Sequence, residues 1–194
     1  MQAARGASLN PSDATDNPTG AADGPRPRSL LVFAGVAVVG YTLDLVTKVL
    51  AVEHLADRAP VQVVGDFLTL SLARNPGAAF STGTSYTLVL TCVAIAAAVT
   101  VLWISRRLRS TGWAIGLGFL MAGVLGNLTD RIFRAPGSFR GHVVDFLQLP
   151  HWPIFNVADV CINVAAGVII LQAVRGISVN GTRGRDTHDP APAP

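Results

Sequence analysis

Four apolar segments, each close to 20 residues long, restrict what this chain can fold into. They span residues 30–50, 86–104, 113–132 and 154–174. About 20 apolar residues cross the hydrocarbon core of a bilayer as a helix, which satisfies its backbone hydrogen bonds internally. Half of the residues are hydrophobic and only 14% are charged, too apolar a balance for an ordinary soluble domain. The sequence therefore predicts an α-helical multi-pass membrane protein whose membrane domain spans residues 29–175.

Polar tails at residues 1–28 and 176–194 have no apolar periodicity and are predicted to be disordered. With four crossings, both termini lie on the same side of the membrane. Positive residues concentrate on the cytoplasmic side of membrane proteins, so the side with more of them is expected to be cytoplasmic. The tails and the loop at 106–109 carry nine arginines against five on the opposite side, which favours cytoplasmic termini. The nine are Arg5, Arg26, Arg28, Arg106, Arg107, Arg109, Arg175, Arg183 and Arg185.

The same arginines flank the apolar segments and do not alternate with aromatic residues, so membrane orientation explains them better than nucleic-acid binding does. Cys92 and Cys161 each lie inside an apolar run without metal-ligand spacing. We therefore expect no nucleic-acid partner, no metal site and no cofactor.

The connection between the first two apolar segments differs in kind. Val61, Val63 and residues 67–72 alternate apolar and polar side chains, as a short strand or hairpin does. The sequence NPGA from Asn75 to Ala78 suits a type II turn, which needs positive φ at its glycine. The sequence thus predicts a small sheet on the bilayer surface.

Four carboxylates lie in or beside apolar sequence, where an unpaired charge is costly. Asp44 lies late in the first outward-running segment and Asp130 closes the third. Asp145 lies in the last external connection, and Asp159 falls about 8 Å into the fourth segment at the helical rise per residue. All four are therefore expected to gather in the outer third of the membrane.

Polar partners accompany these carboxylates at helical spacing. Asp44 and Lys48 are four residues apart, which indicates either a neutralising ion pair or a pair that organises a site. Asn127, Asp130 and Arg131 project from one side of the third segment. Asp130 and Arg131 could simply end that helix, but Asn127 lies deeper and needs a polar partner. On the fourth segment Asn156, Asp159 and Asn163 are expected to share one helix face.

Asp145 and Asp159 are the predicted catalytic pair. An external-loop aspartate such as Asp145 is often only solvated. However, peptide hydrolysis without a metal or a nucleophile needs two carboxylates that share a proton, so that one activates water and the other polarises the carbonyl. Spacing alone leaves open whether Asp130 takes the place of Asp145.

Five motifs occur in a fixed order and together carry a family resemblance. They are DLVTK from Asp44, RNPGAAF from Arg74, GNLTDR from Gly126, VVDF from Val143 and FNVAD from Phe155. In these motifs, over residues 30–174, the chain resembles the lipoprotein signal peptidases (signal peptidase II), the membrane aspartyl proteases of bacteria.

The resemblance implies four transmembrane helices with a small extracytoplasmic β-cradle, in the bacterial cell membrane. It implies removal of signal peptides from diacylglyceryl-modified prolipoproteins, just before the lipidated cysteine, by the catalytic residues Asp145 and Asp159. The partners would be these lipid-modified precursors and membrane lipid, and we expect a monomer. The supporting residues that match the family's motifs are Asp44, Lys48, Asn75, Gly77, Asn127, Asp130, Arg131 and Asn156.

Two other classes remain as alternatives from the residues alone. A small proton-coupled transporter would also carry intramembrane carboxylates, but near the midplane, where they can be reached from both sides. A structural four-helix scaffold would tolerate the replacement of its aspartates.

Overall fold

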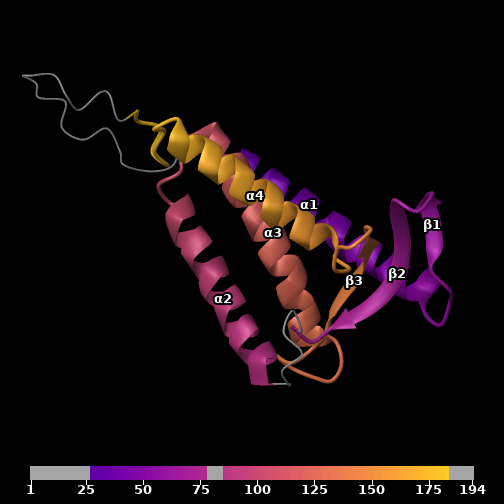
Figure 1. Ribbon diagram of the computed structural model, residues 1–194. Helices are drawn as coiled ribbons and strands as arrows, with labels where there is room; N and C mark the ends of the chain where they lie inside the picture. The colour runs from indigo at the N-terminus through magenta and orange to yellow at the C-terminus, as the bar shows by residue number, and fades with distance from the viewer. Residues whose placement is uncertain (1–26, 78–84, 184–194) are drawn as a thin grey trace, which may run out of the picture.

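The structure, a computed structural model, describes residues 27–77 and 85–183. Its four helices are α1 (Pro27–Leu55), α2 (Ser85–Ser105), α3 (Thr111–Phe133) and α4 (Val157–Val174). Each contains a segment long and apolar enough to cross a membrane. Three strands, β1 (Val61–Val64), β2 (Leu68–Asn75) and β3 (Val143–Gln148), form a small sheet at one end of the bundle (Figure 1). The predicted fold class, four transmembrane helices with a small sheet, is confirmed.

Helix α3 is the centre of the bundle and has the largest buried share of the four. It packs against both α1 and α4, and α2 runs beside it (Figure 1). Glycines permit this close packing, as expected for membrane helices. A Cβ at Gly118 would lie 2.9 Å from the Phe33 carbonyl oxygen of α1, and one at Gly123 only 2.4 Å from the Ala158 carbonyl oxygen of α4.

The sheet is antiparallel with strand order β1-β2-β3. The β1–β2 hairpin was predicted from alternation, and Gly77 has the predicted positive φ, +106°. The remainder of that turn and of the RNPGAAF motif, residues 78–80, lies outside the described residues. The prediction that residues 143–146 form a loop was wrong, because they pair with β2 across some 70 residues of chain, where Ala73 lies opposite Asp145. Local alternation does not reveal such a distant partner.

The helix bounds differ from the predicted ones, most of all at α1 and at the start of α4. Helix α1 runs from Pro27 to Leu55, so it ends five residues later than predicted and its first two residues belong to the predicted tail. Helix α4 starts at Val157, three residues later than predicted, because Phe155 is still extended and its backbone bonds to Leu147 of β3. Asp159 is therefore only about 3 Å, two residues, into the helix by the rise per residue.

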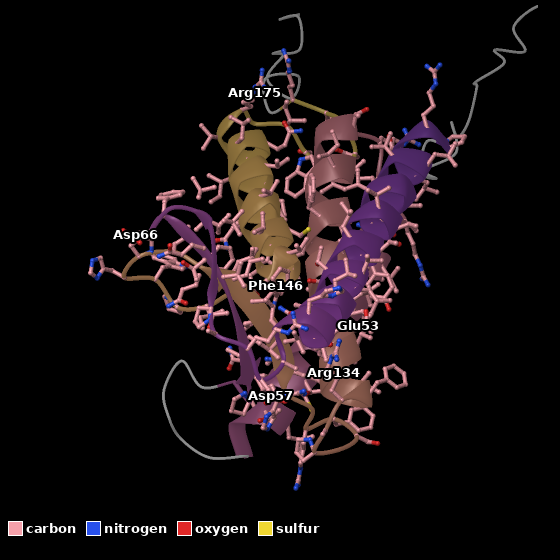
Figure 2. The ribbon with its side chains drawn as sticks, turned by 90° about the vertical axis from the view of Figure 1, so that its right-hand side faces the viewer. Glu53, Asp57, Asp66, Arg134, Phe146 and Arg175 are labelled. Carbon is pink, nitrogen blue, oxygen red and sulfur yellow. The ribbon has the colours of Figure 1, made fainter. Side chains whose placement is uncertain are left out.

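The predicted disorder of the C-terminal tail is wrong for residues 176–183. This segment forms a turn against the α2–α3 connection: Trp113 Nε1 donates to the Ile177 carbonyl at 2.7 Å, and the Arg109 and Ser110 amides both donate to Val179. The expectations for residues 1–26 and 184–194 concern parts of the chain outside the described residues. Figure 2 shows that Arg175, which precedes this turn, and Arg134 lie at opposite ends of the bundle.

Candidate active site

Four carboxylates, each from a different element, meet where the helix bundle joins the sheet. Asp44 comes from α1, Asp130 from α3, Asp145 from β3 and Asp159 from the first turn of α4. One lysine and two asparagines link them through ion pairs and hydrogen bonds. The predicted convergence of these four residues is confirmed.

Lys48 is the centre of the helical part of this network. Its ammonium is fully buried, and Nζ lies 2.8 Å from Asp44 Oδ2, 3.0 Å from Asp130 Oδ2 and 3.0 Å from Asn127 Oδ1. Asn127 Oδ1 accepts a hydrogen bond from the ammonium, and the Asp44 and Asp130 carboxylates form ion pairs with it. A buried charge is tolerated only with such complete pairing. Lys48 thus forms the neutralising ion pair with Asp44 that was one of the two alternatives, and it also joins α1 to the polar residues of α3.

Asp44 also fastens α1 to the start of α4. Its Oδ1 accepts a hydrogen bond of 2.8 Å from the Ala158 backbone amide, one of the amides of the first helical turn that have no partner within the helix. Gly126 of α3 makes room for this contact, since a Cβ there would lie 2.3 Å from Asp44 Oδ2.

Asp130 has both oxygens bound within the fold. Oδ2 accepts from the Val144 amide at 3.1 Å as well as from Lys48, and Oδ1 accepts from Arg134 Nε one turn further along α3. These bonds join α1, the end of α3 and strand β3. Sequence reasoning overlooked Arg134 as a partner, although its i,i+4 spacing from Asp130 was the available signal.

Asn156 is the N-cap of α4, whereas the sequence placed it within the helix. Its side-chain Oδ1 accepts from the Asp159 amide at 3.0 Å, and its own amide donates to Asp159 Oδ2 at 3.1 Å. This reciprocal arrangement is a capping box, in which an asparagine and an acidic residue three positions later satisfy the free amides of a helix start. The cap therefore determines where the Asp159 carboxylate lies.

The two asparagine side chains connect the carboxylates of β3 and α4. Asn156 Nδ2 donates to Asp145 Oδ1 at 2.6 Å and lies 3.2 Å from Asn127 Oδ1. Asn127 Nδ2 in turn donates to Asp159 Oδ1 at 3.0 Å. Asn127 thus has the polar partners that its depth in the membrane required.

Asp145 is almost completely buried, with 2% of its surface exposed. Besides Asn156, it accepts a hydrogen bond of 2.9 Å at Oδ2 from Asn75 Nδ2, at the end of β2. Burial raises the pKa of the Asp145 carboxyl to about 6. The two amide donors and the charge of Lys48 oppose this rise in pKa, whereas the charge of Asp159 adds to it. Asp145 therefore holds a proton to a higher pH than an ordinary aspartate.

Asp159 is only half-buried, in contrast to Asp145. The Arg131 guanidinium, at the end of α3, lies within electrostatic reach of both carboxylates, and its buried Nε has no hydrogen-bond partner among the described residues. Asn163 does not join the network, contrary to the expectation that it shares the polar face, because it is exposed and donates to the Asp159 carbonyl within α4.

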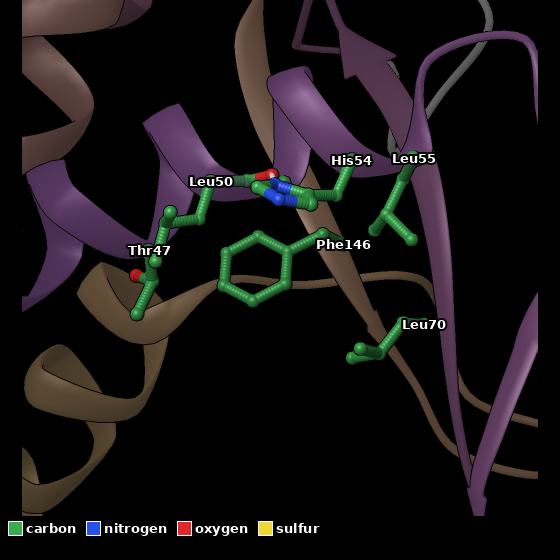
Figure 3. A pocket seen from close by; sticks show the side chains of 7 residues that line it. Thr47, Leu50, His54, Leu55, Leu70 and Phe146 are labelled. Atoms are coloured by element: carbon green, nitrogen blue, oxygen red, sulfur yellow. Dashed lines mark hydrogen bonds between the residues drawn. The ribbon is translucent and has the colours of Figure 1, made fainter.

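An apolar cavity of about 400 Å³ lies on the face of β3 opposite the carboxylates, and Phe146 lines it. Successive side chains of a strand point to opposite faces, so Phe146 and its neighbour Asp145 lie on different sides of β3. The walls of the cavity come from the C-terminal part of α1, including Thr47, Leu50 and His54, and from Leu70 of β2 (Figure 3). Within residues 27–77 and 85–183, no three His, Cys, Asp or Glu side chains are arranged to hold a metal ion.

Residues 36–175 match the family model described as signal peptidase (SPase) II. The chain belongs to the signal peptidase II family. A lipoprotein signal peptidase of Mycobacterium tuberculosis (strain H37Rv) is 50% identical over 159 residues, which cover 82% of this chain and 78% of that protein. One of Rhodococcus jostii (strain RHA1) is 48% identical over 172 residues, covering 87% and 86%.

Solved structures of bacterial membrane enzymes match this chain at the level of the fold. The structure of a bacterial membrane enzyme determined by the in meso method at 1.9 Å resolution matches with a TM-score of 0.63 at 24% identity, over 76% of this chain and 93% of that one. A second, at 2.3 Å resolution, matches with a TM-score of 0.60. Membership of this family makes the chain a multi-pass membrane peptidase, which favours that class over the transporter and scaffold alternatives.

Proposed function

We propose that this chain is an aspartic endopeptidase that removes signal peptides from diacylglyceryl-modified prolipoproteins, cutting just before the lipidated cysteine. Asp145 and Asp159 are the catalytic pair. The observation that carries the proposal is that one residue, Asn156, binds both carboxylates, Asp145 through its side chain and Asp159 through its backbone amide. Family membership supports the substrate class.

The different environments of the two carboxylates support different roles. Asp145 is buried and keeps its proton up to a pH of about 6, its pKa, so it is the group that hydrogen-bonds the scissile carbonyl. Asp159 is half-buried and can contact a water molecule, so it is the general base. Two carboxylates in different environments, one acting as acid and one as base, are a usual arrangement for this chemistry.

The reaction then proceeds in two steps. Asp159 takes a proton from water, the hydroxide oxygen bonds to the carbonyl carbon, and Asp145 gives its proton to the carbonyl oxygen. The resulting diol intermediate collapses as the C–N bond breaks, the proton held by Asp159 passes to the leaving amine of the lipidated cysteine, and a hydroxyl proton returns to Asp145. The Arg131 guanidinium faces both carboxylates and limits the negative charge of the pair.

Asp130 is a weaker candidate than Asp145 for this pair. Both of its oxygens bind groups that hold the fold together, namely Lys48, Arg134 and the Val144 amide. We assign Asp130 a supporting role, together with Asp44, Lys48, Asn75, Gly77, Asn127, Arg131 and Asn156.

We further propose that the protein is a monomer in the bacterial cell membrane, with both termini in the cytoplasm and the site at the outer face. The predicted tails and the loop at 106–109 carry more arginines than the connections on the other side of the membrane segments, and this excess supports the orientation.

The test is cleavage of a purified diacylglyceryl-modified prolipoprotein, with the cut located by mass spectrometry. Wild type is expected to cut before the modified cysteine, and Asp145→Asn and Asp159→Asn to lose at least about a hundredfold in rate while remaining folded. Asp66→Asn, the same change on the exposed β1–β2 hairpin, is the matched control. Activity in Asp145→Asn together with inactivity in folded Asp130→Asn would show that the pair is assigned to the wrong residue.

A further inference from the structure

Two buried threonines of α2, Thr87 and Thr91, form hydrogen bonds outside their own helix. The Thr87 hydroxyl donates to the Pro76 carbonyl. The Thr91 hydroxyl lies 2.9 Å from the Phe139 carbonyl oxygen, in addition to 2.8 Å from the Thr87 carbonyl within the helix. The two side chains are 1% and 0% exposed.

This pattern differs from that of Thr100, the third threonine of α2. Thr100 is exposed, and its hydroxyl donates to the Ala96 carbonyl one turn back along α2. A threonine within a helix commonly uses its hydroxyl donor in this way. Thr87 and Thr91 instead connect α2 to two other segments, and both of these segments lead to the carboxylate network.

The Pro76 carbonyl belongs to the turn that orients Asn75. The side chain of Asn75 accepts a hydrogen bond from the Gly77 amide at 2.8 Å through Oδ1 and donates to Asp145 Oδ2 through Nδ2. The direction of this amide therefore depends on the shape of the turn. Thr87 holds the turn at its middle residue, and Leu90 packs against Gly77 so closely that a Cβ there would lie 2.5 Å from Leu90 Cδ1.

The Phe139 carbonyl belongs to residues 134–142, the connection that leads from α3 into β3. Its two ends are already fixed, by bonds from the Gly141 amide to Arg131 and from the His142 amide to Ala135. Thr91 adds an attachment to α2 near the middle of the connection, at a residue four positions before β3 begins.

We propose that Thr87 and Thr91 are positioning residues, which fix the two segments flanking Asp145 and so set its place relative to Asp159. This gives α2 a part in the reaction, although among the described residues it contributes no side chain to the carboxylate network. The inference rests on the proposed function, because it concerns the geometry of that catalytic pair.

The test compares Thr87→Val and Thr91→Val with Thr100→Val. Valine keeps the β-branched shape and removes only the hydroxyl donor. Each of the first two variants is expected to lower kcat about tenfold with KM within about twofold, since small displacements of a catalytic group cost rate. Thr100→Val is expected to cleave like wild type. Thr87→Ser and Thr91→Ser keep the hydroxyl and should restore most of the rate, which a loss of packing alone would not allow.

The pH profile separates the two threonines. Besides Asn75, the groups that face Asp145 are Asn156 and Asp159 of the α4 start, Lys48 of α1 and Arg131 of α3. Thr87→Val loosens only the Asn75 donor, which favours the ionised carboxylate, so the pKa of Asp145 should rise. Thr91→Val leaves Asn75 in place and should change kcat without this rise.

Three results would overturn the inference: cleavage by both valine variants at the rate of Thr100→Val, serine variants as slow as the valine variants, or an unchanged pKa of Asp145 in Thr87→Val. The pKa is measured by a carbon-13 NMR titration of the aspartate carboxyls, with Asp145→Asn to assign the signal. This measurement needs no substrate. A wild type that never cleaves would therefore count against the proposed function, while the titration would still decide the role of Thr87.

Discussion

Replacing Asp145 with asparagine should alter how the stability of the fold depends on pH. In the folded protein the pKa of this carboxyl is raised from 3.8 to about 6, because the group is buried. Between these two values the folded state binds a proton that the unfolded chain has released. The stability that comes from this proton is fully present below pH 3.8 and is lost as the pH rises through about 6.

The size of the effect follows from the width of this window. One pH unit of difference in proton affinity corresponds to about 1.4 kcal/mol, so wild type should lose at most about 3 kcal/mol of unfolding free energy between pH 4 and pH 7 through this group. Asp145→Asn has no such titration. The asparagine also changes the hydrogen bonds to Asn75 and Asn156, but that cost is the same at both pH values and cancels when the two are compared.

The assay is unfolding of both proteins in mixed micelles at pH 4 and pH 7. The unfolding free energy of Asp145→Asn minus that of wild type should be larger at pH 7 than at pH 4, by up to about 3 kcal/mol. For a chain of this size, this corresponds to roughly 6–12 °C in unfolding temperature. Asp66→Asn, at an exposed carboxylate, should show no comparable change. A difference between Asp145→Asn and wild type that does not vary with pH would refute the burial argument.

Two further predictions concern the network around α1 and α3. Lys48→Met should lower the unfolding free energy by about 3–5 kcal/mol, because it leaves the Asp44 and Asp130 carboxylates buried beside each other. The double variant Lys48→Met, Asp44→Asn should recover part of this loss. Both variants are measured by unfolding in micelles. Gly126→Ala should cost about 1–3 kcal/mol and most of the cleavage activity, since its methyl group would collide with Asp44. Gly167→Ala in α4, where nothing lies within 4 Å, should instead be neutral or stabilising by up to about 1 kcal/mol in the same unfolding assay; equal losses in both alanine variants would contradict the packing argument.

The features that could be predicted from the sequence are those that the membrane itself imposes. A lipid-embedded chain needs long apolar helices, and its carboxylates stand out against them, so the helices and the meeting of Asp44, Asp130 and Asp159 followed from segment order and helical rise. Strand β3 could not be found in this way, because its pairing with β2 depends on a distant segment. The same holds for Thr87 and Thr91, whose acceptors are backbone carbonyls that carry no sequence signal.

The start of α4 was misplaced for a different reason. Ile154 and Phe155 are apolar, and hydropathy alone assigns them to the membrane segment, whereas their backbone continues the extended pairing with β3. The Asn156 cap and the acidic residue three positions later were the local signal for the true start.

This capping box ties helix formation to the assembly of the site. The carboxylate that caps α4 is Asp159 itself, so the first turn of α4 and the proposed general base take their places in a single event. A chain in which α4 started one residue earlier or later would turn Asp159 by about 100° around the helix axis and remove it from Asn127. If Asp159 is the general base that we propose, α4 has only one start that is both capped and catalytically competent, and we expect a chain with α4 inserted in another register to be inactive from the outset.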